Sequence, residues 1–112
     1  MPVVKLFAVG LPIALGVVMV GAGTVNFVGP RSVRESFARW GYPAGFHRLT
    51  GGLEVVAGLL LLVPATRWAG AIGSIVILAA AAMTLIRWRE WSHLPGAVVL
   101  IAAAAGTLAI HG

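Results

Sequence analysis

The chain has no cysteine and few acids, and both absences narrow what it can do. Without cysteine it can form no disulfide, bind no iron–sulfur cluster through thiolates and carry out no thiol redox chemistry. Any redox role must therefore use a cofactor or a partner. Only three acidic residues stand against eight Lys and Arg, giving a formal net charge of +5. The bases lie at the ends of apolar runs, as in membrane proteins, so this charge does not indicate nucleic-acid binding.

Long apolar runs dominate what remains: hydrophobic residues make up 60% of the chain, and its mean hydropathy is +1.01. Four stretches carry almost no charge, namely residues 6–28, 49–66, 68–86 and 94–110. About 20 helical apolar residues span a hydrocarbon core of ~30 Å, so each stretch can approach or complete a crossing. We therefore predict an all-α fold, a polytopic membrane four-helix bundle in which residues 1–112 form a single transmembrane domain.

Glycine and proline set the expected helix ends. Gly29 followed by Pro30 ends the first helix, and Pro64 ends the second, because proline cannot continue a helix. Ser32 and Glu35 have the spacing of a capping box, which predicts a short helix along the membrane surface. The expected transmembrane helices cover about residues 3–28, 44–63, 67–88 and 95–110, with an interfacial helix at about 32–40 between the first and the second.

Basic residues are unevenly divided between the two ends of such a bundle. The connections after the first and third helices hold or adjoin Arg31, Arg34, Arg39, Arg48, Arg87 and Arg89, whereas the other end has Lys5 and Arg67. Positive residues favour the cytoplasmic side of a membrane. We therefore expect a multi-pass protein of the cell membrane, with loops 1–2 and 3–4 in the cytoplasm and both termini outside.

Glu54 is the only acid within the apolar runs, and it anchors the predicted site. A carboxyl inside a membrane is costly unless it has partners or a task. His47 lies on the same face of the second helix, about 10 Å nearer the basic side. Residues of the first and third helices should reach the same depth, around a pocket open toward the basic side. The predicted ligand-binding residues are Glu54, His47, Asn26, Thr50, Thr84, Arg87 and Arg48.

Two interpretations of these side chains stay open. Asn26, Thr50 and Thr84 are also of the types that hydrogen-bond between membrane helices, and His47 and Arg48 could be snorkelling interfacial residues. Glu54 and His47 are the candidate catalytic residues, for a reaction that is unknown. No metal is predicted, because the histidines and acids lack the spacing of a metal site.

Three short motifs resemble a known family. Residues 39–46 read Arg-Trp-Gly-Tyr-Pro-Ala-Gly-Phe, residues 51–58 read Gly-Gly-Leu-Glu-Val-Val-Ala-Gly, and a leucine run before Pro64 is followed by Arg67. In this order they resemble the DoxX-like family of small four-helix membrane proteins. Many members have lysine at the place of Asn26, so the ion pair that a lysine could make with Glu54 is absent here. The resemblance implies the fold and a link to quinone-dependent respiratory oxidoreductases.

Several functions fit these observations. The first is a subunit or accessory protein of redox or quinone-linked membrane metabolism, with no intrinsic cofactor but with a quinone or other lipophile bound near Glu54. The second is a small dimeric proton-coupled transporter of lipophilic compounds, and the third is an intramembrane acid–base enzyme, an isomerase or cyclase. The expected partners are the lipid bilayer, a small lipophilic ligand and a homodimer or larger membrane complex, with no nucleic acid.

Overall fold

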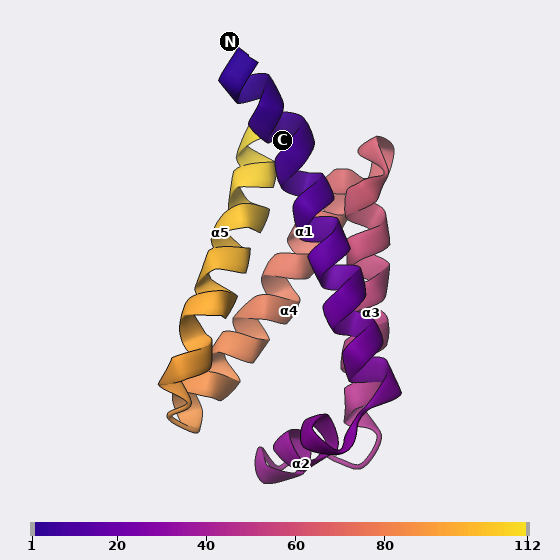
Figure 1. The fold of residues 1–112 in the computed structure, drawn as a ribbon, viewed down its shortest axis with the longest axis vertical. Coiled ribbons are helices and arrows are strands. Elements are labelled where there is room, and N and C mark those ends of the chain that lie inside the picture. The colour runs from indigo at the N-terminus through magenta and orange to yellow at the C-terminus, as the bar shows by residue number, and fades with distance from the viewer. Residues whose placement is uncertain (1, 112) are drawn as a thin grey trace.

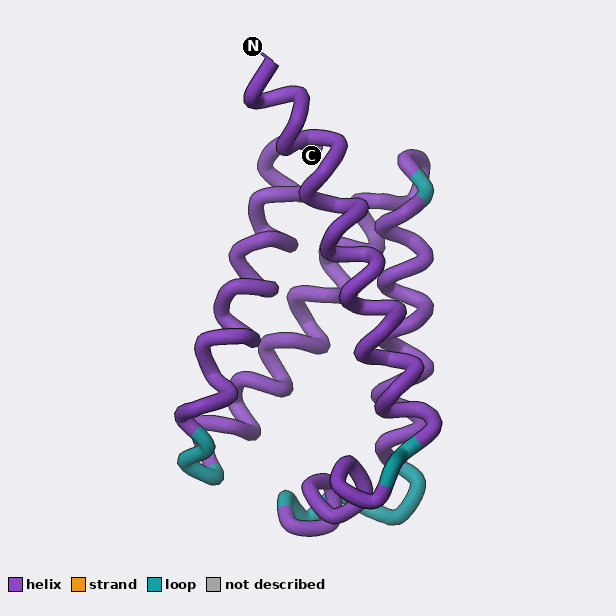
Figure 2. Tube along the Cα trace, viewed as in Figure 1, coloured by secondary structure: helices purple, strands orange, loops and turns teal. Residues whose placement is uncertain are grey.

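The computed structural model describes residues 2–111, and helices make up most of it (Figures 1 and 2). The elements are α1 (Pro2–Val28), α2 (Arg31–Arg39), α3 (Phe46–Leu62), α4 (Arg67–Arg87) and α5 (Leu94–His111), with 3-10 turns at Pro64–Thr66 and Trp91–His93. The predicted all-α class is confirmed. The protein extends 47 Å along its longest axis, more than the ~30 Å of a bilayer core.

Within residues 2–111, three helical stretches are long and apolar enough to cross a membrane: Pro2–Val28, Pro64–Arg87 and Trp91–Ile110. The helix that carries Glu54, α3, is shorter, with 17 residues that rise about 25 Å. It begins at Phe46 because Gly45 has a left-handed φ of 85°, a conformation that glycine adopts without steric cost. The three long apolar stretches are typical of a membrane protein.

The capping box predicted at Ser32 and Glu35 is wrong. α2 begins at Arg31, with Pro30 as the N-cap and no side-chain cap hydrogen bond. Glu35 instead accepts a hydrogen bond from Arg31 Nε at 2.9 Å, the i, i+4 pairing of an exposed helix face. Because proline is already suited to the start of a helix, α2 starts too early for Ser32 to cap it.

The connection between α3 and α4 is a tight turn that closes the end of α3. Arg67, expected from the sequence as a charge at the end opposite α2, is only 8% exposed, and its Nε donates to the Leu61 carbonyl at 2.8 Å. The Thr66 hydroxyl donates to the Leu60 carbonyl at 2.9 Å. These bonds satisfy carbonyls that have no partner within the helix, and they hold α3 and α4 as a hairpin.

Glycines allow α1 and α3 to pack backbone against backbone. A Cβ atom added at Gly51 would lie 2.5 Å from the Gly23 carbonyl oxygen, and one added at Gly58 would lie 2.7 Å from the Gly16 carbonyl oxygen. Small residues at such positions are typical of membrane helix interfaces, where close packing supplies the attraction that the hydrophobic effect supplies in water.

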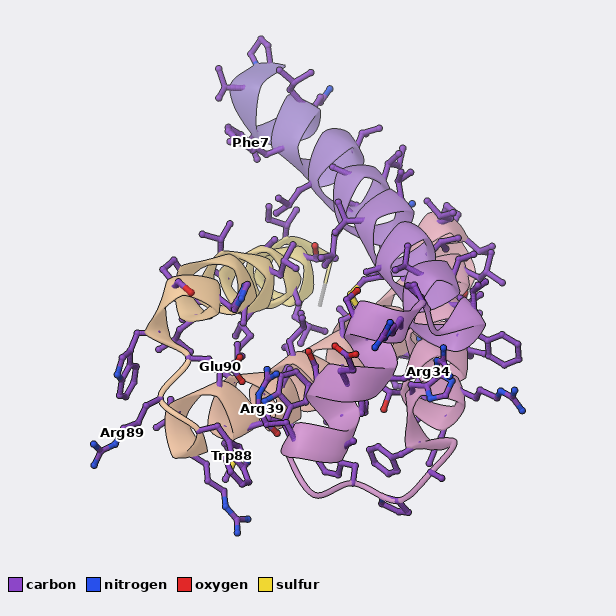
Figure 3. All side chains as sticks on the ribbon, turned by 60° about the horizontal axis from the view of Figure 1, so that its bottom comes forward. Phe7, Arg34, Arg39, Trp88, Arg89 and Glu90 are labelled. Atoms are coloured by element: carbon purple, nitrogen blue, oxygen red, sulfur yellow. The ribbon has the colours of Figure 1, made fainter. Side chains whose placement is uncertain are left out.

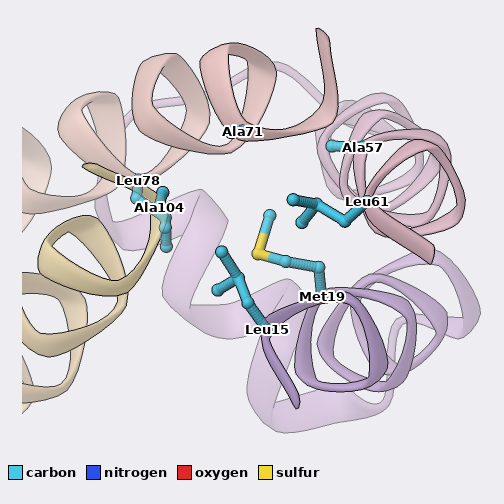
Figure 4. Close-up of a cluster of buried hydrophobic side chains, with 7 residues drawn as sticks. All are labelled: Leu15, Met19, Ala57, Leu61, Ala71, Leu78 and Ala104. Carbon is cyan, nitrogen blue, oxygen red and sulfur yellow. The ribbon is translucent and has the colours of Figure 1, made fainter. Parts of the chain in front are cut away.

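A core of small and medium side chains fills the space where four helices meet (Figure 4). Leu15 and Met19 come from α1 and Leu61 from α3, and their side chains converge on the middle of the cluster. The members of the cluster are Leu15, Met19, Ala57, Leu61, Ala71, Leu78 and Ala104. The alanines of this core let the helix backbones approach one another.

The neighbouring glycines Gly51 and Gly52 provide a matched test of this packing. We expect Gly51→Ala to lower the free energy of unfolding by about 1–3 kcal/mol, because the added methyl group meets backbone that cannot give way. Nothing lies within 4 Å of a Cβ added at Gly52. Gly52→Ala should therefore be neutral or stabilise α3 by up to ~1 kcal/mol. Unfolding by SDS titration in mixed micelles measures both, and equal effects would contradict the close contact.

Candidate functional site

A cavity of about 380 Å³ lies between α3 and α4, at the end of the molecule that α2 covers (Figure 1). Its volume is at the low end of the 300–1,000 Å³ that is typical of small-molecule sites. Most of the wall is apolar, with Leu53 from α3 and Ile77 and Leu85 from α4. A few residues of the lining are polar, so the cavity combines a hydrophobic surface with a small number of hydrogen-bonding groups.

The polar groups farthest from α2 are Asn26 and Glu54. Asn26 Nδ2 donates to Glu54 Oε1 at 2.5 Å, and Glu54 is 6% exposed. The packing of glycine explains this contact: Gly23 lies directly against the turn of α3 that carries Glu54, and Asn26 is one helical turn further along α1. The backbone contact of α1 with α3 thus brings an amide onto a carboxyl.

Glu54 has no cation beside it in the part of the chain that the structure describes. The ion pairs there are Arg31 with Glu35 and Arg39 with Glu90, both at the α2 end. Asn26 stabilises one carboxyl oxygen by a hydrogen bond but supplies no charge. A buried carboxyl in this environment is able to bind a ligand or to handle a proton.

Aromatic side chains bound the end of the cavity nearest α2. Tyr42 and Phe46 are stacked, with ring centroids 4.6 Å apart and an interplanar angle of 11°. The Phe37 ring lies 5.4 Å from the Trp40 ring and 5.8 Å from the Tyr42 ring. All four residues line the cavity, so α2, the loop after it and the first residue of α3 form an aromatic cap, comprising Phe37, Trp40, Tyr42 and Phe46.

A hydrogen bond ties this aromatic cap to α4. The Tyr42 hydroxyl lies 2.6 Å from Thr84 Oγ1, and Thr84 Oγ1 donates its own proton to the Ala80 carbonyl at 3.0 Å. Since a hydroxyl has one proton, Tyr42 is the donor to Thr84. The loop after α2 is therefore held across the cavity and against its far wall.

Glu90 fixes α2 a second time, from the connection between α4 and α5 (Figure 3). Arg39 Nη2 donates to Glu90 Oε1 at 2.8 Å, and the Trp40 indole N–H donates to the other carboxylate oxygen. The Trp40 hydrogen bond is the main cause that holds the pKa of Glu90 below its ordinary value of 4.5, and the positive charge of Arg39 lowers this pKa further. The aromatic cap is thus anchored at two neighbouring points, Thr84 in the last turn of α4 and Glu90 in the connection that follows.

Four of the predicted ligand-binding residues line the cavity, namely Asn26, Thr50, Glu54 and Thr84. The other three do not. His47 is 8% exposed, and its ring lies against Gly29 and edge-on to Phe37, so it is not brought to the cavity with Glu54. Arg48 and Arg87 are exposed and lie outside the lining.

The helical geometry explains this division. His47 and Glu54 share a face of α3, because seven residues are close to two turns. That face meets α1, and Gly29, directly after α1, lies against the His47 ring. The cavity lies to one side of the contact, along Phe46, Thr50 and Leu53, and Glu54 stands at the border. A shared helix face therefore does not give the two candidate catalytic residues a shared environment.

Sequence reasoning missed the aromatic cap and the role of Glu90. A signal was available for the cap, since Phe37, Trp40, Tyr42 and Phe46 stand close together in a chain with only 8% aromatic residues. No pattern in the sequence indicated that Glu90 would reach Arg39. In the described chain, no three His, Asp or Glu side chains come together as metal ligands.

These features define a helical membrane protein with a small, mostly apolar cavity that one buried carboxyl enters. The chain belongs to the DoxX-like family, whose model matches residues 10–107. The resemblance seen in the motifs is thereby confirmed, and the match includes all of the residues that line the cavity. No curated protein and no solved structure matches the chain.

The bonds of Glu90 predict a pH-dependent attachment of α2. Because the pKa of Glu90 is lowered in the folded protein, its stabilisation is present above the ordinary value of 4.5 and is lost as the pH falls through the lower folded value. At neutral pH, Glu90→Gln should speed amide hydrogen exchange in Arg31–Arg39, and the variant and wild type should converge in acid. Glu35→Gln removes only an exposed i, i+4 pair and is the control. A difference that persists in acid would contradict the assignment.

Proposed function

We propose that the protein binds a small lipophilic molecule in this cavity, as a subunit or accessory protein of redox or quinone-linked metabolism in the membrane. The observation that carries the proposal is the Asn26–Glu54 pair, which places hydrogen-bonding groups in a mostly apolar cavity. Small-molecule sites commonly have this composition, with apolar walls for affinity and a few polar groups for orientation.

The unused hydrogen-bonding capacity of these residues supports such a ligand. Asn26 uses one of its two amide protons on Glu54, which leaves the second proton and the amide oxygen. Within the described chain, the Thr50 hydroxyl and the second oxygen of Glu54 also have no hydrogen-bond partner. A carbonyl or hydroxyl group on a ring could bond to this set, and both groups occur in the two redox states of a quinone.

The redox chemistry in this proposal belongs to the bound molecule or to a partner protein. A chain without cysteine exchanges no electrons through thiols. The protein would hold and position the lipophile, and a homodimer or a larger membrane complex would complete the function. The hypothesis of an intramembrane acid–base enzyme has less support, because His47 lies outside the cavity lining that includes Glu54.

The membrane arrangement that we propose has four crossings, with α3 as the fourth and α2 at the interface. Both termini and the α3–α4 turn lie at one end of the molecule in Figure 1, and α2 and the α4–α5 connection lie at the other. The ~25 Å rise of α3 is a few ångströms short of the ~30 Å core, a mismatch that bilayers accommodate at small cost. The arginine-rich α2 end would face the cytoplasm, with both termini outside.

The absence of native cysteine makes this topology directly testable. Ala65→Cys places a thiol in the α3–α4 turn, and Ser92→Cys places one in the α4–α5 connection. In intact cells, a membrane-impermeant maleimide should label Ala65→Cys and leave Ser92→Cys unlabelled until the membrane is opened. The reverse pattern would invert the orientation, and labelling of both sites in intact cells would show that α4 does not cross the membrane once between them.

Ligand binding is tested by native mass spectrometry of gently extracted protein, with analysis of the lipids that copurify. Wild type should retain a quinone or another small lipophile, and Glu54→Gln should lose it, because the substitution alters the carboxyl in the cavity wall. We expect binding roughly tenfold weaker in Kd, which corresponds to about 1.4 kcal/mol. Glu35→Gln is the matched control, since Glu35 is exposed on α2, away from the cavity.

A different result would support a different function. If wild type is empty and drives proton-dependent efflux of lipophilic compounds that Glu54→Gln abolishes, the cavity serves a transporter. A carboxyl that has no cation beside it would then be the proton-handling group. Equal occupancy in wild type and Glu54→Gln would remove the Asn26–Glu54 pair from ligand binding.

A further inference from the structure

We infer that the cavity opens sideways to the lipid, through a window between α3 and α4, and that its ligand is an amphiphile with a compact polar head and a long apolar tail. The head would lie in the cavity and the tail would leave through the window. This inference rests on the proposed function and specifies the class of ligand and its route of entry.

The window follows from the way α3 and α4 cross. At Gly70 the two backbones touch, since an added Cβ would lie 2.7 Å from the Ala57 carbonyl oxygen. One turn further along α4, a Cβ added at Gly73 would lie 3.7 Å from Ala57 Cβ, which is an ordinary van der Waals contact. Beyond this point the helices diverge toward the α2 end (Figure 1), and the cavity occupies the space between them.

The exposed residues of the cavity wall mark where it opens. Leu53 on α3 is 50% exposed and Val76 on α4 is 63% exposed, and both belong to the lining. Ala80 and Ala81, also in the lining, are exposed as well. These residues lie within the apolar parts of their helices, so the solvent that they face in the native environment is hydrocarbon.

The end toward the water is obstructed by comparison. The aromatic cap lies across it, Tyr42 is bonded to Thr84, and Glu90 holds Arg39 and Trp40. The aromatic side chains of the cap are half-buried, whereas Ala80 and Ala81 on α4 are exposed. A ligand dissolved in the bilayer therefore meets a lower barrier than one dissolved in water.

The size of the cavity determines the class of ligand. A volume of about 380 Å³ is at the low end for small-molecule sites and suits one ring or a similar head group. The polar groups of Asn26, Thr50 and Glu54 give the head its hydrogen bonds. A long tail does not fit beside the head, so it must remain in the lipid, which the window permits.

Spin labels on single cysteines test the window without a ligand, because the chain has no other thiol. In liposomes, labels at Val76→Cys and Ala80→Cys should collide with oxygen, which concentrates in lipid, as often as a label at Val17→Cys. Val17 is 59% exposed on α1 and lies outside the cavity. Collisions with a water-soluble nickel chelate should be as rare as at Val17→Cys.

Two other results would overturn the inference. Frequent collisions with the nickel chelate at Val76→Cys and Ala80→Cys would show a cavity open to water. Rare collisions with both reagents, as expected for a label at the buried Ala71, would show that protein covers the window.

Binding of two probes separates this inference from the proposed function. The probes are a dimethoxy-methyl-benzoquinone with a ten-carbon chain and the same ring without it. Leu53→Trp, and Val76→Phe as a second variant at an exposed position, should weaken binding of the chain-bearing probe about tenfold more than binding of the chainless probe. Glu54→Gln should weaken both. If the window variants weaken neither probe, or weaken both equally, the lateral route is wrong even though the cavity binds. If neither probe binds to wild type, the spin labels alone decide the route.

Discussion

The close contact of α1 with α3 determines where the polar groups of this protein lie. Glycines on both helices bring the two backbones together, and the contact at Gly23 places Asn26 over Glu54. A larger residue at this crossing would separate the helices and take the amide away from the carboxyl. Glu54 would then lose its only hydrogen bond within the described chain, and a buried carboxyl without one is costly in a membrane. The same glycines thus govern packing and the chemistry of the cavity wall.

Much of the fold could be predicted from the sequence, because membrane helices are specified by local composition. Long apolar runs indicate the spans, and glycine and proline indicate where helices end. The motif around Glu54 indicated the family, and the depth of each residue along its helix grouped Asn26 with Glu54 in one predicted site. Their direct contact depends on the antiparallel direction of α1 and α3. The number of crossings and the orientation remain predictions that rest on charge and length.

The aromatic cap could not be derived in the same way. Its position depends on a loop in which Gly41 and Gly45 have left-handed φ angles of 82° and 85°, and helical periodicity carries no information about such a path. The bond from Tyr42 to Thr84 joins residues 42 positions apart in the sequence, and Glu90 is 51 positions from Arg39. Burial of His47 likewise depends on the turn at Gly29. Local patterns determine faces of helices, whereas these contacts depend on the direction in which the chain leaves a helix.

The hydrogen bonds of the α3–α4 turn also bear on how the chain enters the membrane during its synthesis. α3 is the shortest of the four long helices and carries the carboxyl, so by itself it partitions into lipid less readily than its neighbours. The turn at Pro64–Thr66 and the buried Arg67 join it to α4, which is longer and has no carboxyl side chain. In the proposed arrangement of four crossings, the pair would leave the insertion machinery as one helical hairpin, in which α4 supplies the free energy of transfer that α3 lacks. Biogenesis of the polar cavity wall would then depend on the helix that follows it.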